Sequence, residues 1–348
     1  MTLLSGITSR TVATDRYEAN ILERADDSVD APAVVFIHGN VSSSLFWQPT
    51  MLRLPAEHRA IAIDLRGFGD SETKPVDATR GLGDYSDDVA SVLAALGVGS
   101  ANFVGWSMGG GVVMQLMLEH PGLARTVTLQ APVSPYGFGP VARDGSLLTP
   151  DAAGSGAGGV NPDFIERLRS GDTSEAEQTS PRNVYRASYV KPGFVSEYED
   201  VWVESMLTTK VTEGNYPGDS VVSENWPGFA PGGVGVLNTM APTHFNTSAI
   251  VDLEVKPPLL WIHGTDDAIV SDASFFDFNH LGALGVIPAW PGADVAPAQE
   301  MVSQSRDVFT RYQDAGGQFT EIELADCGHS PQLEKPAEFD AALHAHLR

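Results

Sequence analysis

Residues 102–111 read Asn102-Phe103-Val104-Gly105-Trp106-Ser107-Met108-Gly109-Gly110-Gly111, and this stretch decides the fold. Phe103 and Val104 are typical of the end of a buried strand, and the apolar run that begins at Val112 favours a helix. A Gly-x-Ser-x-Gly sequence between a strand and a helix forces the serine into a strained turn. Glycine is needed on both sides of Ser107, because a side chain there would collide with the neighbouring strand or helix. The turn presents a hydroxyl at a helix N-terminus, whose N–H groups can receive a negatively charged oxygen.

The composition predicts a soluble globular protein with a large acidic excess. The chain has 348 residues, 42% of them hydrophobic, and a formal net charge of −24. Nucleic acids and anionic membranes would be repelled, so we expect neither as a partner. No apolar run approaches the ~18 residues of a membrane span, and residues 1–20 lack the pattern of a secretory signal. We therefore expect a cytoplasmic protein with a solvated acidic surface, with adaptation to high salt as the alternative.

Cofactor and metal signals are absent from the sequence. Cys327 is the only cysteine, which excludes an intrachain disulfide and a cysteine-based metal site. The glycine-rich string at 154–159 has no Gly-x-x-x-x-Gly-Lys form and no preceding strand, so we do not expect it to bind phosphate. We expect no metal and no organic cofactor, and a small molecule as the substrate. The sequence leaves the oligomeric state open, a homodimer included.

Strands and helices alternate along most of the chain. Continuous apolar runs predict strands buried on both faces, and apolar residues at helical spacing predict helices between them. The expected strands lie at 34–37, 60–63, 103–104, 126–129, 259–262 and 319–324, and the expected helices at 85–96, 112–120, 300–315 and 336–347. An antiparallel strand pair is expected within residues 8–24. This alternation predicts an α/β protein with a doubly wound, mostly parallel sheet.

The alternation stops between residues 133 and 255. This segment contains loops rich in Gly, Ser and Pro, many aromatic residues, and short helix-like pieces such as 164–169 and 198–207. We interpret it as an inserted cap, mainly helical and rich in loops. The expected domains are a core of residues 1–132 and 256–348 and a cap of residues 133–255.

A serine hydroxyl becomes a nucleophile only beside a base, which a third group must orient. His329 is the candidate base because it lies in the loop after the last predicted strand; among the other histidines, His244 in the cap is the main alternative. The orienting acid should follow an earlier strand end. Asp267 is favoured there because its Gly-x-x-Asp-x-x-Val setting is usual for such an acid, and Asp266 is interpreted as a loop or capping residue.

Acyl transfer also needs two backbone N–H donors for the developing oxyanion. Met108 follows the candidate nucleophile directly and supplies one of them. Asn40, in His38-Gly39-Asn40, supplies the other, because the second donor comes from the loop after an earlier strand. Cys327 lies beside His329, and we interpret it as a buried filler residue.

These motifs together resemble the α/β-hydrolase superfamily. They are His38-Gly39, Asp64-x-Arg66-Gly67-x-Gly69-x-Ser71, Gly105-Trp106-Ser107-Met108-Gly109-Gly110, Gly264-x-x-Asp267 and Gly328-His329. The resemblance covers residues 30–132 and 256–348, and it implies a triad in the order Ser, Asp, His. Residues 38–47 are similar to a segment of haloalkane dehalogenases and epoxide hydrolases, which attack with an aspartate where this chain has Ser107. The turn Gly105-Trp106-Ser107-Met108-Gly109-Gly110 is more similar to that of esterases and cofactor-free haloperoxidases.

The sequence therefore predicts a serine hydrolase of carboxylic esters or lactones, acting on small to medium, largely apolar substrates through an acyl-enzyme on Ser107. One alternative keeps the same triad and cleaves a C–C bond in a 1,3-diketone-type substrate. Another is a ligand-binding receptor on a hydrolase scaffold, with little turnover.

Overall fold

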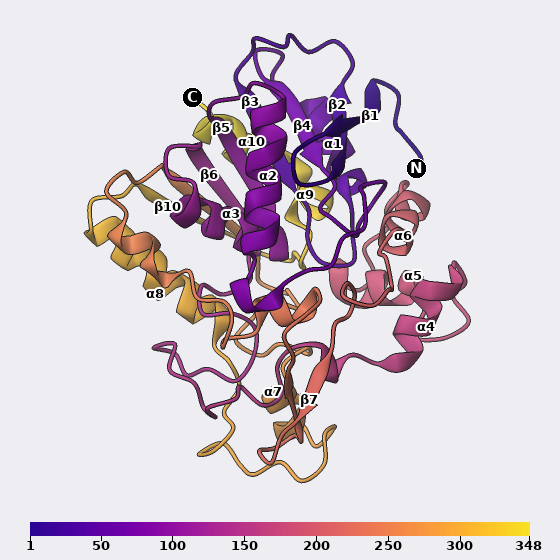
Figure 1. Cartoon of the computed structure of the whole chain (residues 1–348), viewed down its shortest axis with the longest axis vertical. Helices are drawn as coiled ribbons and strands as arrows, with labels where there is room; N and C mark the ends of the chain where they lie inside the picture. The colour runs from indigo at the N-terminus through magenta and orange to yellow at the C-terminus, as the bar shows by residue number, and fades with distance from the viewer.

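An eight-stranded sheet forms the centre of the computed structural model, which describes residues 1–348 (Figure 1). Its order is β1-β2-β4-β3-β5-β6-β9-β10. Strand β2 runs antiparallel to both of its neighbours, β1 and β4, and all other pairs are parallel. The strands are β1 (Ile7–Ala13), β2 (Glu18–Arg24), β3 (Ala33–Ile37), β4 (Arg59–Ile63), β5 (Ala101–Trp106), β6 (Ala124–Gln130), β9 (Leu259–Gly264) and β10 (Phe319–Leu324). The predicted doubly wound, mostly parallel sheet is confirmed.

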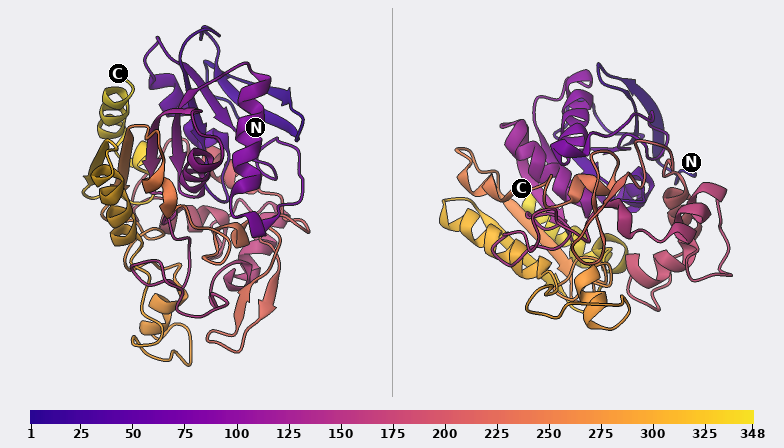
Figure 2. Two further views of the ribbon diagram at one scale, coloured as in Figure 1. Left: turned by 60° about the vertical axis from the view of Figure 1, so that its left-hand side comes forward. Right: turned by 60° about the horizontal axis from the view of Figure 1, so that its bottom comes forward.

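Helices cover both faces of this sheet. On one face, α2 (Gly83–Ala95) packs against α3 (Met108–Glu119), and on the other α1 (Gln48–Arg53) packs against α10 (Pro336–His346) (Figures 1 and 2). The helix α8 (Met301–Asp314) packs against the edge strand β10, and the short α9 (Pro331–Glu334) precedes α10. Every residue of β3, β4, β5 and β9 is buried, as expected for strands covered on both sides.

Two long connections lie beyond the carboxyl ends of the parallel strands, in the lower half of Figure 1. The first joins β6 to β9 and contains α4 (Pro162–Ser170), α5 (Pro181–Val184), α6 (Glu199–Leu207), β7 (Ser220–Val222) and β8 (Phe229–Pro231). The second joins β9 to α8 and contains α7 (Phe278–Ala283). They touch each other, since the rings of Phe229 and Phe278 meet edge to face with 5.0 Å between centroids. The division into a core and a cap of residues 133–255 stays a prediction.

The register of the central strands decides which loops meet. Gly105 of β5 pairs with Ile37 of β3 on one side and with Leu129 of β6 on the other. The loops that follow these three strands therefore leave the sheet at the same edge. Residues 38–43, Ser107 and the loop after β9 are brought to this edge by strand pairing alone.

Candidate active site

Ser107 occupies the sharp turn between β5 and α3. Its backbone has φ of 57° and ψ of −121°, a conformation that L-residues rarely adopt. The close approach of backbone on either side explains the two glycines: a Cβ on Gly105 would lie 2.5 Å from the carbonyl oxygen of Gly109, and a Cβ on Gly109 would lie 2.5 Å from that of Ile37. The strained serine is held because Gln130 and Val133 bond to its backbone N–H and C=O. Strain that is retained in this way is typical of a functional position.

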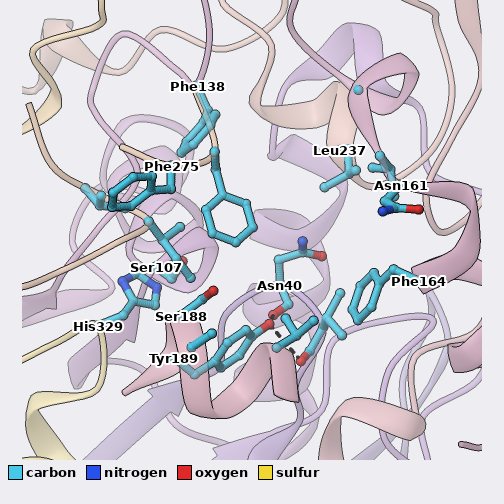
Figure 3. A pocket seen from close by; sticks show the side chains of 18 of the residues that line it. Asn40, Ser107, Phe138, Asn161, Phe164, Ser188, Tyr189, Leu237, Phe275 and His329 are labelled. Atoms are coloured by element: carbon cyan, nitrogen blue, oxygen red, sulfur yellow. Dashed lines mark hydrogen bonds between the residues drawn. The ribbon is translucent and has the colours of Figure 1, made fainter. Parts of the chain in front are cut away.

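His329 and Asp267 form a buried pair. The Nδ1 atom of His329 lies 2.8 Å from Oδ2 of Asp267, and the two side chains are 2% and 1% exposed. A carboxylate can only accept, so Nδ1 carries the proton and Nε2 keeps a free lone pair. Figure 3 shows the His329 ring beside the Ser107 side chain, and both line the same cavity. The structure thus brings together Ser107, Asp267 and His329 from three loops after β5, β9 and β10.

Backbone groups fix the orientation of this pair. The other oxygen of Asp267, Oδ1, accepts hydrogen bonds from the N–H groups of Ile269 (2.8 Å) and Val270 (2.9 Å). The carbonyl oxygen of His329 accepts a 2.8 Å hydrogen bond from the indole N–H of Trp106. The carboxylate and the imidazole are therefore both held by groups next to them in the fold, which limits their rotation.

The alternatives to these residues lie elsewhere. Asp266 is exposed, and its carboxylate faces Lys191 at 3.6 Å rather than His329. The Nε2 atom of His244 lies 3.0 Å from the carbonyl oxygen of Gly232, and His244 does not line the cavity. Cys327 is buried outside the cavity lining, and burial raises the pKa of its thiol well above the ordinary value.

The loop after β3 lies against Ser107. A Cβ on Gly39 would be 3.0 Å from Cβ of Ser107, so a side chain at this position would press against the serine. The carbonyl oxygen of Gly39 accepts from the Ser42 hydroxyl (2.8 Å) and lies 2.7 Å from Nδ1 of His38. His38 donates there, because its Nε2 accepts the N–H of Leu65 at 3.0 Å, and burial lowers the pKa of its imidazole and keeps it neutral. Since N–H and C=O point in opposite directions in a trans peptide, these bonds fix the direction of the Asn40 N–H.

Two backbone N–H groups are free near the serine hydroxyl. Asn40 lines the cavity, and its N–H makes no hydrogen bond within the protein. Met108 begins α3, where the first N–H of a helix has no acceptor within the helix. The side-chain oxygen of Asn40 is also buried without a partner. These two N–H groups have no partner within the protein and could serve as donors to an oxyanion, a role that stays a prediction.

The cavity beside Ser107 is large and mostly apolar. It measures about 1000 Å³, and 19 of its 35 lining residues are hydrophobic. In Figure 3, Phe138 and Phe275 lie near Ser107, whereas Leu237 and Phe164 lie across the cavity. No aspartate, glutamate or lysine lines it, and the single arginine, Arg186, is already bound to Glu199 at 2.8 Å. The cavity lining therefore offers no acidic side chain, no lysine and no unpaired arginine to a substrate.

Part of this lining comes from a segment for which the sequence analysis predicted no role. The connection between β9 and α8 supplies Ile269 and Val270, close to Asp267, and five further lining residues beyond them: Phe275, Phe276, Phe278, Leu281 and Ile287. The length of this connection could have indicated its role. Residues 265–300 are more than an ordinary connection in a compact domain needs, and such long loops often have a function.

Two groups of metal-ligating side chains lie outside the cavity. One contains Asp87, Glu119 and His120, and the other contains His263, Glu321 and Glu323. In each group a carboxylate forms an ion pair with an arginine: Arg80 lies 2.8 Å from Asp87, and Arg306 lies 3.0 Å from Glu321. Ion pairing accounts for both groups, so neither is a candidate metal centre.

Comparison with known proteins identifies the class that this fold and site define. A family model described as the alpha/beta hydrolase family matches residues 34–342, and the chain belongs to this family of hydrolase enzymes. The chain is 34% identical over 119 residues to a 2-(acetamidomethylene)succinate hydrolase of Mesorhizobium japonicum, which covers 34% of this chain and 41% of that protein. It is 27% identical over 220 residues to a 2-hydroxymuconate semialdehyde hydrolase of Pseudomonas sp., covering 59% and 73%.

The solved structures agree on the fold. A carboxylesterase from Bacillus subtilis superposes with a TM-score of 0.59 at 15% identity, over 98% of this chain and 91% of that one. At that identity the likeness extends to the fold alone. None of the helices in the structure has the length and apolar character needed to cross a membrane.

Proposed function

We propose that this hydrolase cleaves carboxylic esters or lactones of small to medium, uncharged and largely apolar substrates. The main support is a serine hydroxyl at an apolar cavity of about 1000 Å³, beside a buried His329–Asp267 pair. Such a cavity suits a substrate of drug-like size that is held mostly by burial of apolar surface. The proposal includes the division into a core and a cap of residues 133–255, whose aromatic side chains would enclose the substrate.

In the proposed reaction, the Ser107 hydroxyl oxygen attacks the acyl carbon while Nε2 of His329 accepts its proton. The negative charge that develops on the carbonyl oxygen is stabilised by the N–H groups of Asn40 and Met108. His329 then gives the proton to the departing alcohol oxygen, and the bond between that oxygen and the acyl carbon breaks. Water attacks the resulting acyl-enzyme with His329 again as the base, releasing the acid and free Ser107. Asp267 holds the imidazole and stabilises its charged form.

Cleavage of a C–C bond by the same residues is the second candidate, favoured by the similarity to the 2-hydroxymuconate semialdehyde hydrolase. The name of that relative's substrate indicates a carboxylate. In this chain the only arginine of the cavity is bound to Glu199 and Glu175, so no free cation is available for a carboxylate. A buried charge without a partner is costly, which favours the uncharged ester.

The test compares wild type with Ser107→Ala on p-nitrophenyl esters, aliphatic lactones and a 1,3-diketone. We expect many turnovers of esters or lactones by the wild type, and loss of at least about a thousandfold in the variant, with an unchanged circular dichroism spectrum. A fluorophosphonate probe should label Ser107, as shown by peptide mass spectrometry. Turnover of the diketone alone would favour C–C cleavage, and a single burst without turnover would favour a ligand receptor.

A further inference from the structure

A short segment of the β6–β9 connection touches both halves of the candidate site. Residues Tyr185–Tyr189 form one π-helical turn, which ends at Val190 in extended conformation and is followed by Lys191. Turns of this kind are rare and are frequently found at functional sites. We call residues 185–191 the clamp segment.

At one end of the clamp segment, Tyr189 holds the loop that carries the Asn40 N–H. Its hydroxyl donates to the carbonyl oxygens of Asn40 at 2.9 Å and Val41 at 3.1 Å, shown as dashed lines in Figure 3. Val41 has φ of 44°, which is strained for a β-branched residue. The loop therefore needs an external restraint, and Tyr189 supplies it from 149 residues away in the sequence.

The ring of Tyr189 also contacts the other site residues. It meets the Trp106 ring edge to face at 5.8 Å and the His329 ring edge to face at 6.4 Å between centroids. Tyr189 is 7% exposed, and burial raises the pKa of its hydroxyl far above the ordinary value. The hydroxyl is thus a neutral donor at physiological pH.

At the other end, Glu334 joins the clamp segment to the loop that carries His329. Its carboxylate accepts the N–H groups of Lys191 (2.8 Å), Gly328 (3.0 Å) and Ser330 (3.2 Å). Two of these donors flank His329 directly. The contact is tight, because a Cβ on Gly328 would lie 2.6 Å from the Lys191 nitrogen. Glu334 thus fixes the His329 loop and the clamp segment relative to each other.

We propose that the clamp segment sets the spacing between His329 and the loop that carries the Asn40 N–H, with Tyr189 and Glu334 as the positioning residues. The inference rests on the proposed function, since it assumes that Asn40 and His329 act on an acyl group at Ser107. The Glu334 carboxylate and the Tyr189 hydroxyl take no part in the chemical steps. Their hydrogen bonds hold N–H groups and loops in place before substrate arrives, which is how preorganised sites lower a barrier.

The first test is Tyr189→Phe, which removes the hydroxyl and keeps the ring. We expect kcat on p-nitrophenyl butyrate to fall about tenfold or more. A misplaced oxyanion donor stabilises the transition state less, whereas binding of the substrate in the ground state does not depend on it. KM should stay within about twofold. Binding of phenylboronic acid, which forms a tetrahedral adduct with the serine, should weaken by the same factor as kcat.

Tyr185→Phe is the matched control. Tyr185 lies on the same turn, is fully buried, and has a hydroxyl without a hydrogen-bond partner. It should leave kcat and boronate binding unchanged, because no bond to the loops is lost. Equal losses in both variants, or an unchanged kcat in Tyr189→Phe, would overturn the role of Tyr189.

The second test is Glu334→Gln, which replaces one acceptor oxygen by an N–H₂ group facing backbone donors. We expect slower labelling of Ser107 by a fluorophosphonate probe, which needs both the base and the oxyanion donors. The Tyr189→Phe/Glu334→Gln double variant should lose much less than the product of the two single losses, because breaking either end releases the same segment. Independent, multiplying losses would contradict a shared clamp. If Ser107→Ala retained turnover, the proposed function itself would fail; a Ser107-dependent enzyme insensitive to Tyr189→Phe would overturn the clamp alone.

Discussion

At the scale of single residues, two neighbouring aspartates with the same chemistry have different surroundings. Asp267 is buried, bonded to His329, and fixed by two backbone N–H groups. Asp266 is 43% exposed in its side chain and faces Lys191 at 3.6 Å. The spacing of the motif favoured Asp267 before any contact was known, and the hydrogen bonds give that preference a physical reason.

Asp267→Asn should therefore cost far more activity than Asp266→Asn. An amide at 267 can donate to Nδ1 and so favour the wrong histidine tautomer, for which a loss of about a thousandfold or more in kcat is expected. Asp266→Asn removes only an exposed ion pair, worth roughly 0–1 kcal/mol of stability, and should leave kcat nearly unchanged. Steady-state kinetics on one ester decide the matter. Equal losses, or the reverse order, would contradict the assignment of Asp267.

At the scale of elements, the strand–turn–helix unit around Ser107 depends on the absence of side chains. Gly105 and Gly109 lie where the start of α3 passes under the ends of β3 and β5. This close approach lets the helix N-terminus lie directly beneath the serine. The helix field and the Met108 N–H are available to an oxyanion only because α3 packs this tightly.

Gly109→Ala tests this packing. The new methyl carbon would lie 2.5 Å from the Ile37 carbonyl oxygen, so β3 and α3 would have to separate. We expect a loss of about 3 kcal/mol or more in the free energy of unfolding, measured by urea denaturation. Gly99→Ala is the control, because nothing lies within 4 Å of a Cβ at that position. A Gly109→Ala protein as stable as the control would show that a methyl group fits between β3 and α3, and would contradict this account of the packing.

At the scale of the whole molecule, charge is kept at the surface and out of the cavity. The chain carries a net charge of −24, yet no acidic residue and no lysine lines the cavity, and Arg186 is neutralised by its partners. The acidic surface repels anions, and the apolar cavity offers a carboxylate no partner. Both effects act against negatively charged substrates.

This arrangement predicts discrimination between p-nitrophenyl butyrate and the p-nitrophenyl monoester of succinic acid. The two acyl chains have similar length, but the second carries a carboxylate. We expect kcat/KM to be lower by about a hundredfold or more for the charged ester. This factor corresponds to about 2–3 kcal/mol of activation free energy. The cause is the partial burial of an ionised carboxylate that has no partner in the cavity. High salt should recover only the part of the difference that arises from surface repulsion, because salt screens long-range interactions and leaves the desolvation cost in the cavity. Comparable values for the two esters would contradict the uncharged-substrate proposal.

The amino-acid pattern alone was sufficient to predict the sheet, the strained turn and the candidate site residues. Strands buried on both faces have unbroken runs of apolar residues. The Gly-x-Ser-x-Gly turn requires glycine at fixed positions. Both features are therefore visible in short stretches of the sequence. His329, Asp267 and Asn40 could be chosen because strand ends in a parallel sheet meet at one edge.

The surroundings of these residues depend on contacts between segments that are far apart in the sequence. The Tyr189 hydroxyl bonds to Asn40 and Val41 across 149 and 148 residues, and Glu334 reaches Lys191 across 143. Phe275 and Phe276 enter the cavity from a connection whose sequence is irregular. Such contacts depend on how loops pack over the sheet, and loop packing has no period that a sequence can display.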